Sequence, residues 1–198
     1  MLDKIRPHFQ PVAEVLAKPF MKLHPNLITA IGASMALFYV YFMSRGEYWL
    51  ALLVLALSSL DFIDGLVARA TGKTSAFGGF FDSTMDRLAD VAYFLGLGFA
   101  LKVDPIWISV VIAISLLISY TRSRYELAVK GNDRLAVGII ERPERLLFIG
   151  VLTLYFALGK TVEIFNTDLS LLLFYILVVL SAITLLQRIY ESWKRLSS

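Results

Sequence analysis

The sequence predicts an all-α integral membrane protein with six transmembrane helices and an N-terminal amphipathic interfacial helix. Of its 198 residues, 58% are hydrophobic and only 18% are charged. In soluble domains about 45–50% of the residues are apolar and about 25% are charged. The apolar residues gather in six blocks, and polar stretches extend four of these blocks at one end. We therefore expect one membrane domain over residues 1–198, with the interfacial helix in residues 1–25 and the six-helix bundle in residues 26–198.

The N-terminal stretch is too polar for a cleaved signal peptide. From Val12 onward, apolar residues recur at roughly helical spacing with charged residues between them. This pattern is typical of a helix that lies on the membrane surface, here interrupted at Pro19. A mobile basic tail is the alternative.

A helix that crosses the bilayer needs about 20 mostly apolar residues. The six blocks are Leu27–Met43, Tyr48–Leu60, Val91–Leu101, Pro105–Tyr120, Leu146–Gly159 and Leu169–Leu186. The first and last nearly span the bilayer unaided, but the middle four are too short. They become long enough only by including polar neighbours, which are Asp61–Arg69, Gly78–Asp90, Thr121–Glu126 and Glu141–Arg145.

In an up-and-down bundle, these four polar extensions all lie on one side of the membrane and converge on a cavity. Ionisable groups at membrane depth usually line a substrate path or an active site. The opposite loops carry only Arg45, Lys102 and Lys160, out of 19 lysines and arginines. The positive-inside rule therefore places the cavity and both termini in the cytoplasm, at the cell membrane. A net charge of +3 is too small to indicate nucleic acid binding.

Four aspartates stand in pairs at helical spacing. Asp61 and Asp64 are three residues apart, and Asp82 and Asp86 are four apart, so each pair shares one helix face. Two such faces meeting across a helical hairpin would repel each other unless cations held them together. Oxygen ligands favour hard cations such as Mg²⁺, Mn²⁺ or Ca²⁺. In a membrane-facing cleft, such ions are suited to a lipid substrate that carries phosphate.

Small residues and one arginine accompany the aspartates. Gly65 and Ala68 leave room for a flat group beside the helix, and Gly78–Gly79 allows close helix packing. Arg69 lies about one turn from Gly65 and can bind a phosphate through its fork of donors.

These residues form the pattern D-x2-D-G-x2-A-R-x8-G-x3-D-x3-D, which resembles the signature of the CDP-alcohol phosphotransferase family at all eight fixed positions. The eight are Asp61, Asp64, Gly65, Ala68, Arg69, Gly78, Asp82 and Asp86. The resemblance implies an enzyme of phospholipid biosynthesis that transfers the lipid part of a CDP-linked lipid to an alcohol and releases CMP. It also implies a homodimer surrounded by membrane lipids.

The resemblance further implies roles for single residues. Asp61, Asp64 and Asp82 would bind divalent metal, with two Mg²⁺ or Mn²⁺ ions expected. Asp86 would be the catalytic base and would also lie near the metals. The CDP-lipid would be held by Asn26, Thr29, Asp61, Gly65, Ala68, Arg69 and Ser75. For Asn26 and Thr29 the alternative is a plain helix start, in which Pro25 breaks the preceding helix and Asn26 caps the next.

Two further polar stretches, Ser119–Glu126 and Glu141–Leu146, direct arginines at the cavity. A phosphorylated acceptor needs such cations, whereas serine, ethanolamine or choline does not. Their sequences are similar to the branch of the family that uses inositol phosphate. That likeness assigns the acceptor phosphate to Ser119, Arg122, Arg142 and Arg145. The alternatives are pairing with Glu141 and Glu144, and glycerol 3-phosphate as acceptor, as in phosphatidylglycerophosphate synthases.

Two other functions remain possible from the residues alone. An ion transporter would need polar groups through the whole membrane, but the outer halves of the middle spans are apolar. An aspartate-rich intramembrane prenyltransferase also binds Mg²⁺ and a pyrophosphate. The Gly65, Ala68 and Arg69 insert and the small number of spans favour CDP-alcohol chemistry. Asp90 falls outside the pattern, as a possible partner for Arg87 or for a neighbouring helix.

Overall fold

A computed structural model describes residues 20–58, 62–129, 133, 135–159, 161–164 and 166–197, without the side chains of residues 62–64 and 70. Most of the predicted interfacial helix, residues 1–19, lies outside the described residues. Residues 20–24 form a turn that leads into the first described helix.

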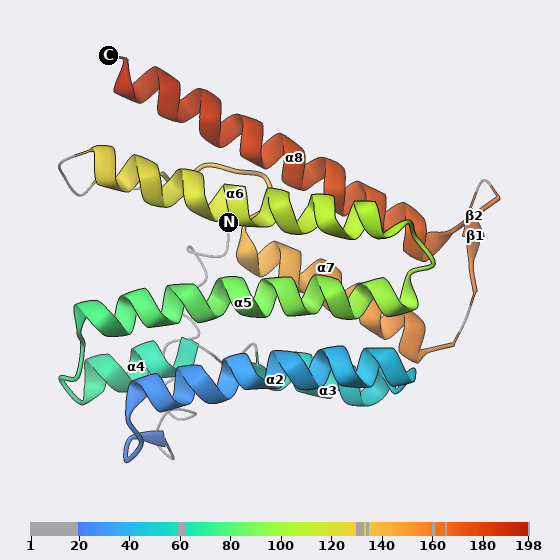
Figure 1. The fold of residues 1–198 in the computed structure, drawn as a ribbon, viewed down its shortest axis with the longest axis horizontal. Helices are drawn as coiled ribbons and strands as arrows, with labels where there is room; N and C mark the ends of the chain where they lie inside the picture. The colour runs from blue at the N-terminus through green and yellow to red at the C-terminus, as the bar shows by residue number, and fades with distance from the viewer. Residues whose placement is uncertain are drawn as a thin grey trace.

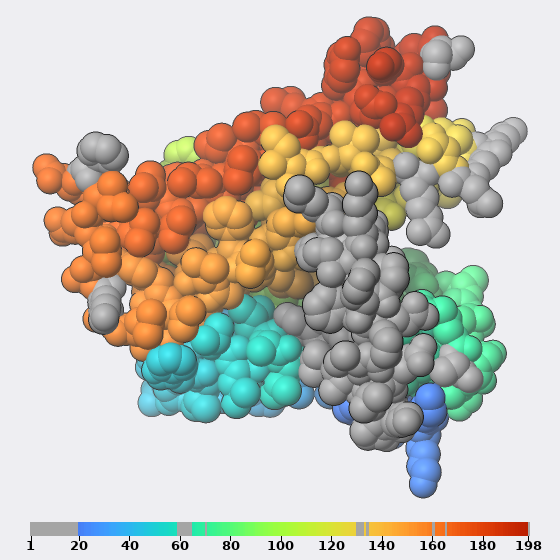
Figure 2. Space-filling model, turned by 180° about the vertical axis from the view of Figure 1, so that it is seen from behind, coloured from blue at the N-terminus to red at the C-terminus, as the bar shows by residue number. Residues whose placement is uncertain are grey.

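Seven helices form an elongated bundle within the described ranges (Figure 1). They are α2 (Pro25–Arg45), α3 (Tyr48–Ser58), α4 (Phe62–Ala70), α5 (Ala76–Ala100), α6 (Pro105–Ala128), α7 (Arg142–Ala157) and α8 (Leu169–Leu196). The helices α5 and α6 continue well into the polar stretches beside their apolar blocks, as the sequence predicts. Helix α5 packs along α2 and α6, while α7 packs against α3, α5 and α8. Figure 2 shows α7 on the back of the molecule, between α3 and α8.

Helix ends follow from local capping. Proline stands at the first position of α2, where a missing N–H costs nothing. The alternative in which Asn26 caps this helix is wrong, because His24 is the cap and its Nδ1 accepts a hydrogen bond from the Asn26 amide at 3.3 Å. Gly46 ends the helix with a φ of 73°, a conformation that glycine adopts without strain. Asp104 caps α6 through the amide of Ile106 at 2.9 Å.

Three of the described helices are long and apolar enough to cross a membrane, namely α2, α6 and α8. Their outward faces keep large apolar side chains exposed, such as Leu37 at 63% and Leu186 at 65%. The buried core contains Tyr39, Phe94 and Phe174 instead. Apolar side chains on both the inside and the outside of a bundle are typical of membrane proteins.

The connection between α7 and α8 contains a short β-hairpin of β1 (Glu163–Ile164) and β2 (Thr167–Asp168). The all-α prediction missed this hairpin, because two-residue strands leave no alternation that a sequence pattern can reveal. Asn166 turns the chain here with a φ of 59°, which asparagine tolerates better than most residues.

The polar helix ends lie together at one end of the bundle. Figure 1 shows the start of α5, the end of α6 and the end of α8 on the same side, with α4 beside them. The hairpin and the connection from α5 to α6 lie at the opposite end. The fold therefore separates a polar end from an apolar remainder.

Candidate active site

One face of α5 carries three carboxylates at four-residue intervals, Asp82, Asp86 and Asp90. Asp82 and Asp86 are half-buried and Asp90 is buried. Of the other predicted metal ligands, Asp61 lies outside the described residues, and Asp64 lies in α4 without a described side chain. Residues 71–75 join α4 to α5, and both helices pack against α2. The fold therefore brings the two aspartate-bearing helices to the same end of the bundle.

A small hollow lies beside Asp86. It is lined by residues of four helices, which are Thr29, Gly32, Ala33, Ser58, Met85, Asp86, Ala89, Tyr93 and Arg142. Several of these side chains are small, so they leave space next to the carboxylate. The Tyr93 hydroxyl donates to Ser58 Oγ at 2.6 Å, which fixes the inner wall. Asp86 thus lines a small hollow where the four helices meet.

Two of the residues predicted near the CDP-lipid, Asn26 and Ser75, lie beside Gly78. A Cβ atom at Gly78 would lie 3.1 Å from Ser75 Oγ and 3.4 Å from Asn26 Oδ1. Glycine at this position therefore lets the start of α5 approach Asn26 closely. Ser75 also caps α5, because its Oγ accepts from the Gly78 amide at 2.9 Å.

The other described residues predicted for the CDP-lipid lie on α2 and α4, whereas Asp61 lies outside the described residues. Arg69 is exposed and folds back over Gly65, with Nη1 3.4 Å from where a Cβ on Gly65 would stand. Ala68 is half-buried. Thr29 is buried at the wall of the hollow, and its Oγ1 donates to the carbonyl of Pro25 at 3.2 Å.

Two of the predicted acceptor arginines meet the carboxylates of α5. Arg142 Nη1 lies 3.0 Å from Asp86 Oδ1, and its Nε donates to Asp90 Oδ1 at 3.2 Å. Arg145 Nη2 donates to Asp90 Oδ2 at 2.9 Å. The alternative pairing of these arginines with Glu141 and Glu144 does not occur through any described contact. Instead, those two glutamates form a capping box at the start of α7.

Arg145 has unused donors inside the protein. Its side chain is 3% exposed, and its Nε and Nη1 are buried without a hydrogen-bond partner among the described residues. A buried cationic donor without a partner is costly. Both nitrogens are enclosed, so an anionic ligand would reach them only if neighbouring side chains moved.

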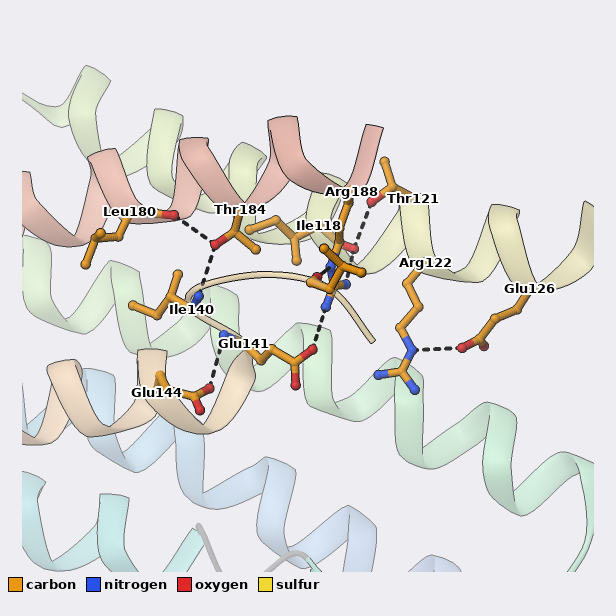
Figure 3. A network of polar contacts seen from close by, with 11 residues as sticks. Ile118, Thr121, Arg122, Glu126, Ile140, Glu141, Glu144, Leu180, Thr184 and Arg188 are labelled. Carbon is orange, nitrogen blue, oxygen red and sulfur yellow. Dashed lines mark hydrogen bonds and ion pairs between the residues drawn. The ribbon is translucent and has the colours of Figure 1, made fainter. Parts of the chain in front are cut away.

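Arg188 on α8 is a residue that the sequence analysis missed. Its Nε donates to the Val137 carbonyl at 2.9 Å, Nη1 to the Ile118 carbonyl at 2.8 Å, and Nη2 to Glu141 at 3.1 Å. Figure 3 shows this arginine joining α6, α8 and the start of α7. Its position near the end of a long apolar helix gave no pattern that separated it from ordinary interfacial charge.

The other two acceptor candidates lie on α6. Arg122 is partly exposed, and its Nε donates to Glu126 at 2.9 Å (Figure 3). Ser119 is half-buried. It follows Ile118, whose carbonyl accepts a hydrogen bond from Arg188. Both Arg122 and Arg145 lie close enough to Arg188 to repel it electrostatically. The arginines of three helices thus form one basic cluster beside the carboxylates.

Comparison with known proteins identifies the family of this chain. The sequence profile of CDP-alcohol phosphatidyltransferases matches residues 22–189. The chain belongs to this family. Its relatives include the archaetidylinositol phosphate synthase of Pyrococcus horikoshii, which is 39% identical over 99% of this chain and 98% of the relative.

Solved structures show the same fold. The phosphatidylinositol phosphate synthase of Mycobacterium tuberculosis with CDP-DAG bound matches with a TM-score of 0.73 and 28% identity, over 92% of both chains. The structure of that enzyme with manganese and citrate also has a TM-score of 0.73, over 92% of this chain and 88% of the other. This CDP-alcohol phosphatidyltransferase therefore shares its fold with a membrane enzyme of phospholipid synthesis.

Proposed function

We propose that the enzyme transfers the phosphatidyl or archaetidyl group of a CDP-linked lipid to a hydroxyl of inositol phosphate and releases CMP. The observation that carries this proposal is the contact between Asp86 on α5 and Arg142 on α7. It places the predicted base directly beside the arginine cluster, where a phosphorylated acceptor can be held.

The donors of the site fit divalent metal ions. Asp82 and Asp86 present carboxylates from one face of α5, and the family pattern adds Asp61 and Asp64. Carboxylate oxygens are the ligands that Mg²⁺ and Mn²⁺ prefer. Two such ions, when bound, would neutralise the pyrophosphate of the CDP-linked lipid. The relative solved with manganese supports this assignment.

The residues of this chain then divide the work. Asn26, Ser75 and Gly78 form a close group that can receive the CDP part. Arg69, which lies over Gly65, can donate hydrogen bonds to a phosphate of the CDP-lipid. Asp86 accepts the proton of the acceptor hydroxyl. The acceptor oxygen forms a bond to the lipid-side phosphorus as the bond from that phosphorus to the CMP oxygen breaks. Because a carboxylate is a weak base for an alcohol, positioning and charge stabilisation supply most of the acceleration.

The acceptor is assigned by the cluster of arginines. Arg145 has two buried donors that no described residue satisfies, and Arg142 lies between the hollow and Asp90. Guanidinium forks are suited to phosphate oxygens. The related synthases of inositol phosphate lipids support the same acceptor. Glycerol 3-phosphate would also satisfy these donors and is the competing candidate.

We further infer the arrangement in the membrane. Six spans would arise from α2, the pair α3 and α4, α5, α6, α7 and α8, within one domain over residues 1–198. The excess of basic residues at the polar end supports a cytoplasmic active site in the cell membrane. A homodimer is expected from the family resemblance.

The test uses purified enzyme in detergent with a CDP-linked lipid and follows CMP release. Inositol phosphate, free inositol, serine and glycerol 3-phosphate are each supplied as acceptor, with Mg²⁺ or Mn²⁺ present. We expect release with inositol phosphate, loss on chelation by EDTA and recovery when metal is restored. Release with free inositol or serine, but not with inositol phosphate, would refute the acceptor while leaving the family unaffected.

A further inference from the structure

Asp90 is a buried carboxylate that the family pattern does not include. It lies on α5 one turn beyond Asp86 and is only 5% exposed. A carboxylate at this depth needs partners. Arg142 and Arg145 donate to its two oxygens at 3.2 and 2.9 Å, and Ser115 on α6 donates at 3.4 Å. Asp90 therefore joins α5 to both acceptor arginines of α7.

We propose that Asp90 is a positioning residue of the acceptor site, which orients Arg142 and Arg145 toward the phosphate of the acceptor. This inference rests on the proposed phosphorylated acceptor. Asp90 itself touches neither the substrate nor the metal in this assignment, because both of its oxygens are engaged by the two arginines.

The contacts of the two arginines support this role. The Nη2 of Arg145 donates to Asp90, while Nε and Nη1 are buried and unpaired among the described residues. Arg142 is held at Nε by Asp90 and at Nη1 by Asp86. If Asp90 were removed, Arg142 would lose its Nε contact and keep the contact of Nη1 with Asp86. Arg142 would then shift toward Asp86, the proposed base.

Charge and orientation predict opposite results when Asp90 is changed. The negative charge of Asp90 repels a phosphate dianion, so its removal alone would strengthen phosphate binding. If Asp90 orients the arginines, its removal weakens phosphate binding although the site becomes more positive. The sign of the change in KM for the acceptor therefore separates a positioning role from simple neutralisation of buried arginines.

The experiment compares Asp90→Asn and Asp90→Glu with wild-type enzyme. Asp90→Asn removes the charge, while Asp90→Glu keeps it and moves it by one methylene group. We expect both variants to raise KM for inositol phosphate about tenfold or more, the scale of a lost charged hydrogen bond, and to change KM for the CDP-lipid less than twofold. Asp104→Asn is the matched control, because asparagine caps a helix as well as aspartate does, and it should match wild type.

Each other outcome overturns the inference. An unchanged or lower KM for inositol phosphate in both variants would assign Asp90 to charge neutralisation. An equal rise in both KM values, or failure of both variants to fold, would assign it to stability alone. If Asp90→Asn alone fails to fold, Asp90→Glu decides by the same criterion.

The proposed function fails in a distinguishable way. If wild-type enzyme uses glycerol 3-phosphate instead, the acceptor assignment is wrong, and the same KM comparison with that acceptor decides the role of Asp90. If wild-type enzyme uses only acceptors without phosphate, both proposals are refuted.

Discussion

Arg142 of α7 bridges two carboxylates of α5, with Nη1 3.0 Å from Asp86 and Nε 3.2 Å from Asp90. One guanidinium group thus connects the predicted catalytic base to the arginine cluster. Its side chain is 26% exposed, so it can also reach an incoming ligand. This geometry requires a planar group with several separated donors, which arginine has and lysine lacks.

The first prediction follows from that bridge. Arg142→Lys keeps the positive charge but cannot span both carboxylates. We expect KM for inositol phosphate to rise about 10- to 100-fold, as for the loss of one charged hydrogen bond, while KM for the CDP-lipid changes little. CMP release measured against each substrate in turn checks this. The control is Arg124→Lys, at an exposed position of α6, and a wild-type KM in Arg142→Lys would contradict the bridging role.

The second prediction separates chemistry from binding. Asp86→Asn preserves the shape of the side chain but removes the proton acceptor. We expect turnover to fall at least about 10²-fold, the usual scale for a positioned base, whereas the CDP-lipid still binds. Single-turnover CMP release and CDP-lipid binding measure the two effects separately. A near-normal rate would exclude Asp86 as the base.

The third prediction concerns the stability that Arg188 provides. This side chain is 3% exposed and donates to two main-chain carbonyls and to Glu141. Arg188→Met keeps much of the volume but leaves these acceptors without their donor. We expect a loss of about 1–3 kcal/mol, as for leaving buried hydrogen-bond acceptors without a donor, seen as a lower unfolding temperature in detergent. Arg124→Met, at an exposed site, should change that temperature little.

Sequence reasoning predicted a mostly helical membrane protein because apolar length is a strong signal, and three of the described helices are long and apolar enough to cross a membrane. The polar extension Gly78–Asp90 lies in one continuous helix with its apolar block, as expected. The hairpin at Glu163–Asp168 and the capping by His24 depend on short-range geometry, which apolar length does not reveal.

The candidate site was predictable to the extent that local spacing determines it. The spacing of Asp82 and Asp86 placed them on one helix face, and the family resemblance indicated Gly78 and Ser75 separately, which the structure brings together. The pairing of Arg142 and Arg145 with Asp90 was not predictable, because it joins residues more than 50 positions apart. The sequence indicated that Asp90 could pair with a neighbouring helix but could not name the partner, and the alternative it offered for the arginines was pairing with Glu141 and Glu144. Such choices depend on how helices pack in three dimensions.

The last prediction concerns the opposite end of the bundle, where Asp168 caps α8. Its Oδ1 accepts from the Ser170 amide at 2.8 Å and from the Ser170 hydroxyl, and Oδ2 accepts from the Tyr155 hydroxyl at 3.1 Å. The hydrogen bond from the Ser170 hydroxyl is the main cause that holds the pKa of Asp168 below its ordinary value. Because the folded pKa is lowered, the stabilisation by the charged form is complete above the unfolded pKa, about 3.9. It is lost as pH falls through the folded pKa.

We therefore expect Asp168→Ala to lower stability by about 1 kcal/mol at pH 7, the usual cost of a lost cap. The difference in unfolding temperature between wild type and Asp168→Ala should shrink as pH is lowered from 5 toward 3. Asp168→Asn is the matched control, since it can still cap the helix but carries no charge, so its difference from Asp168→Ala should be independent of pH. CMP release at pH 7 should stay unchanged in both variants, because Asp168 belongs to β2, which lies at the opposite end of the bundle from α4 and the start of α5 (Figure 1). A constant difference between wild type and Asp168→Ala down to pH 3 would show that the charge of Asp168 contributes nothing to the cap.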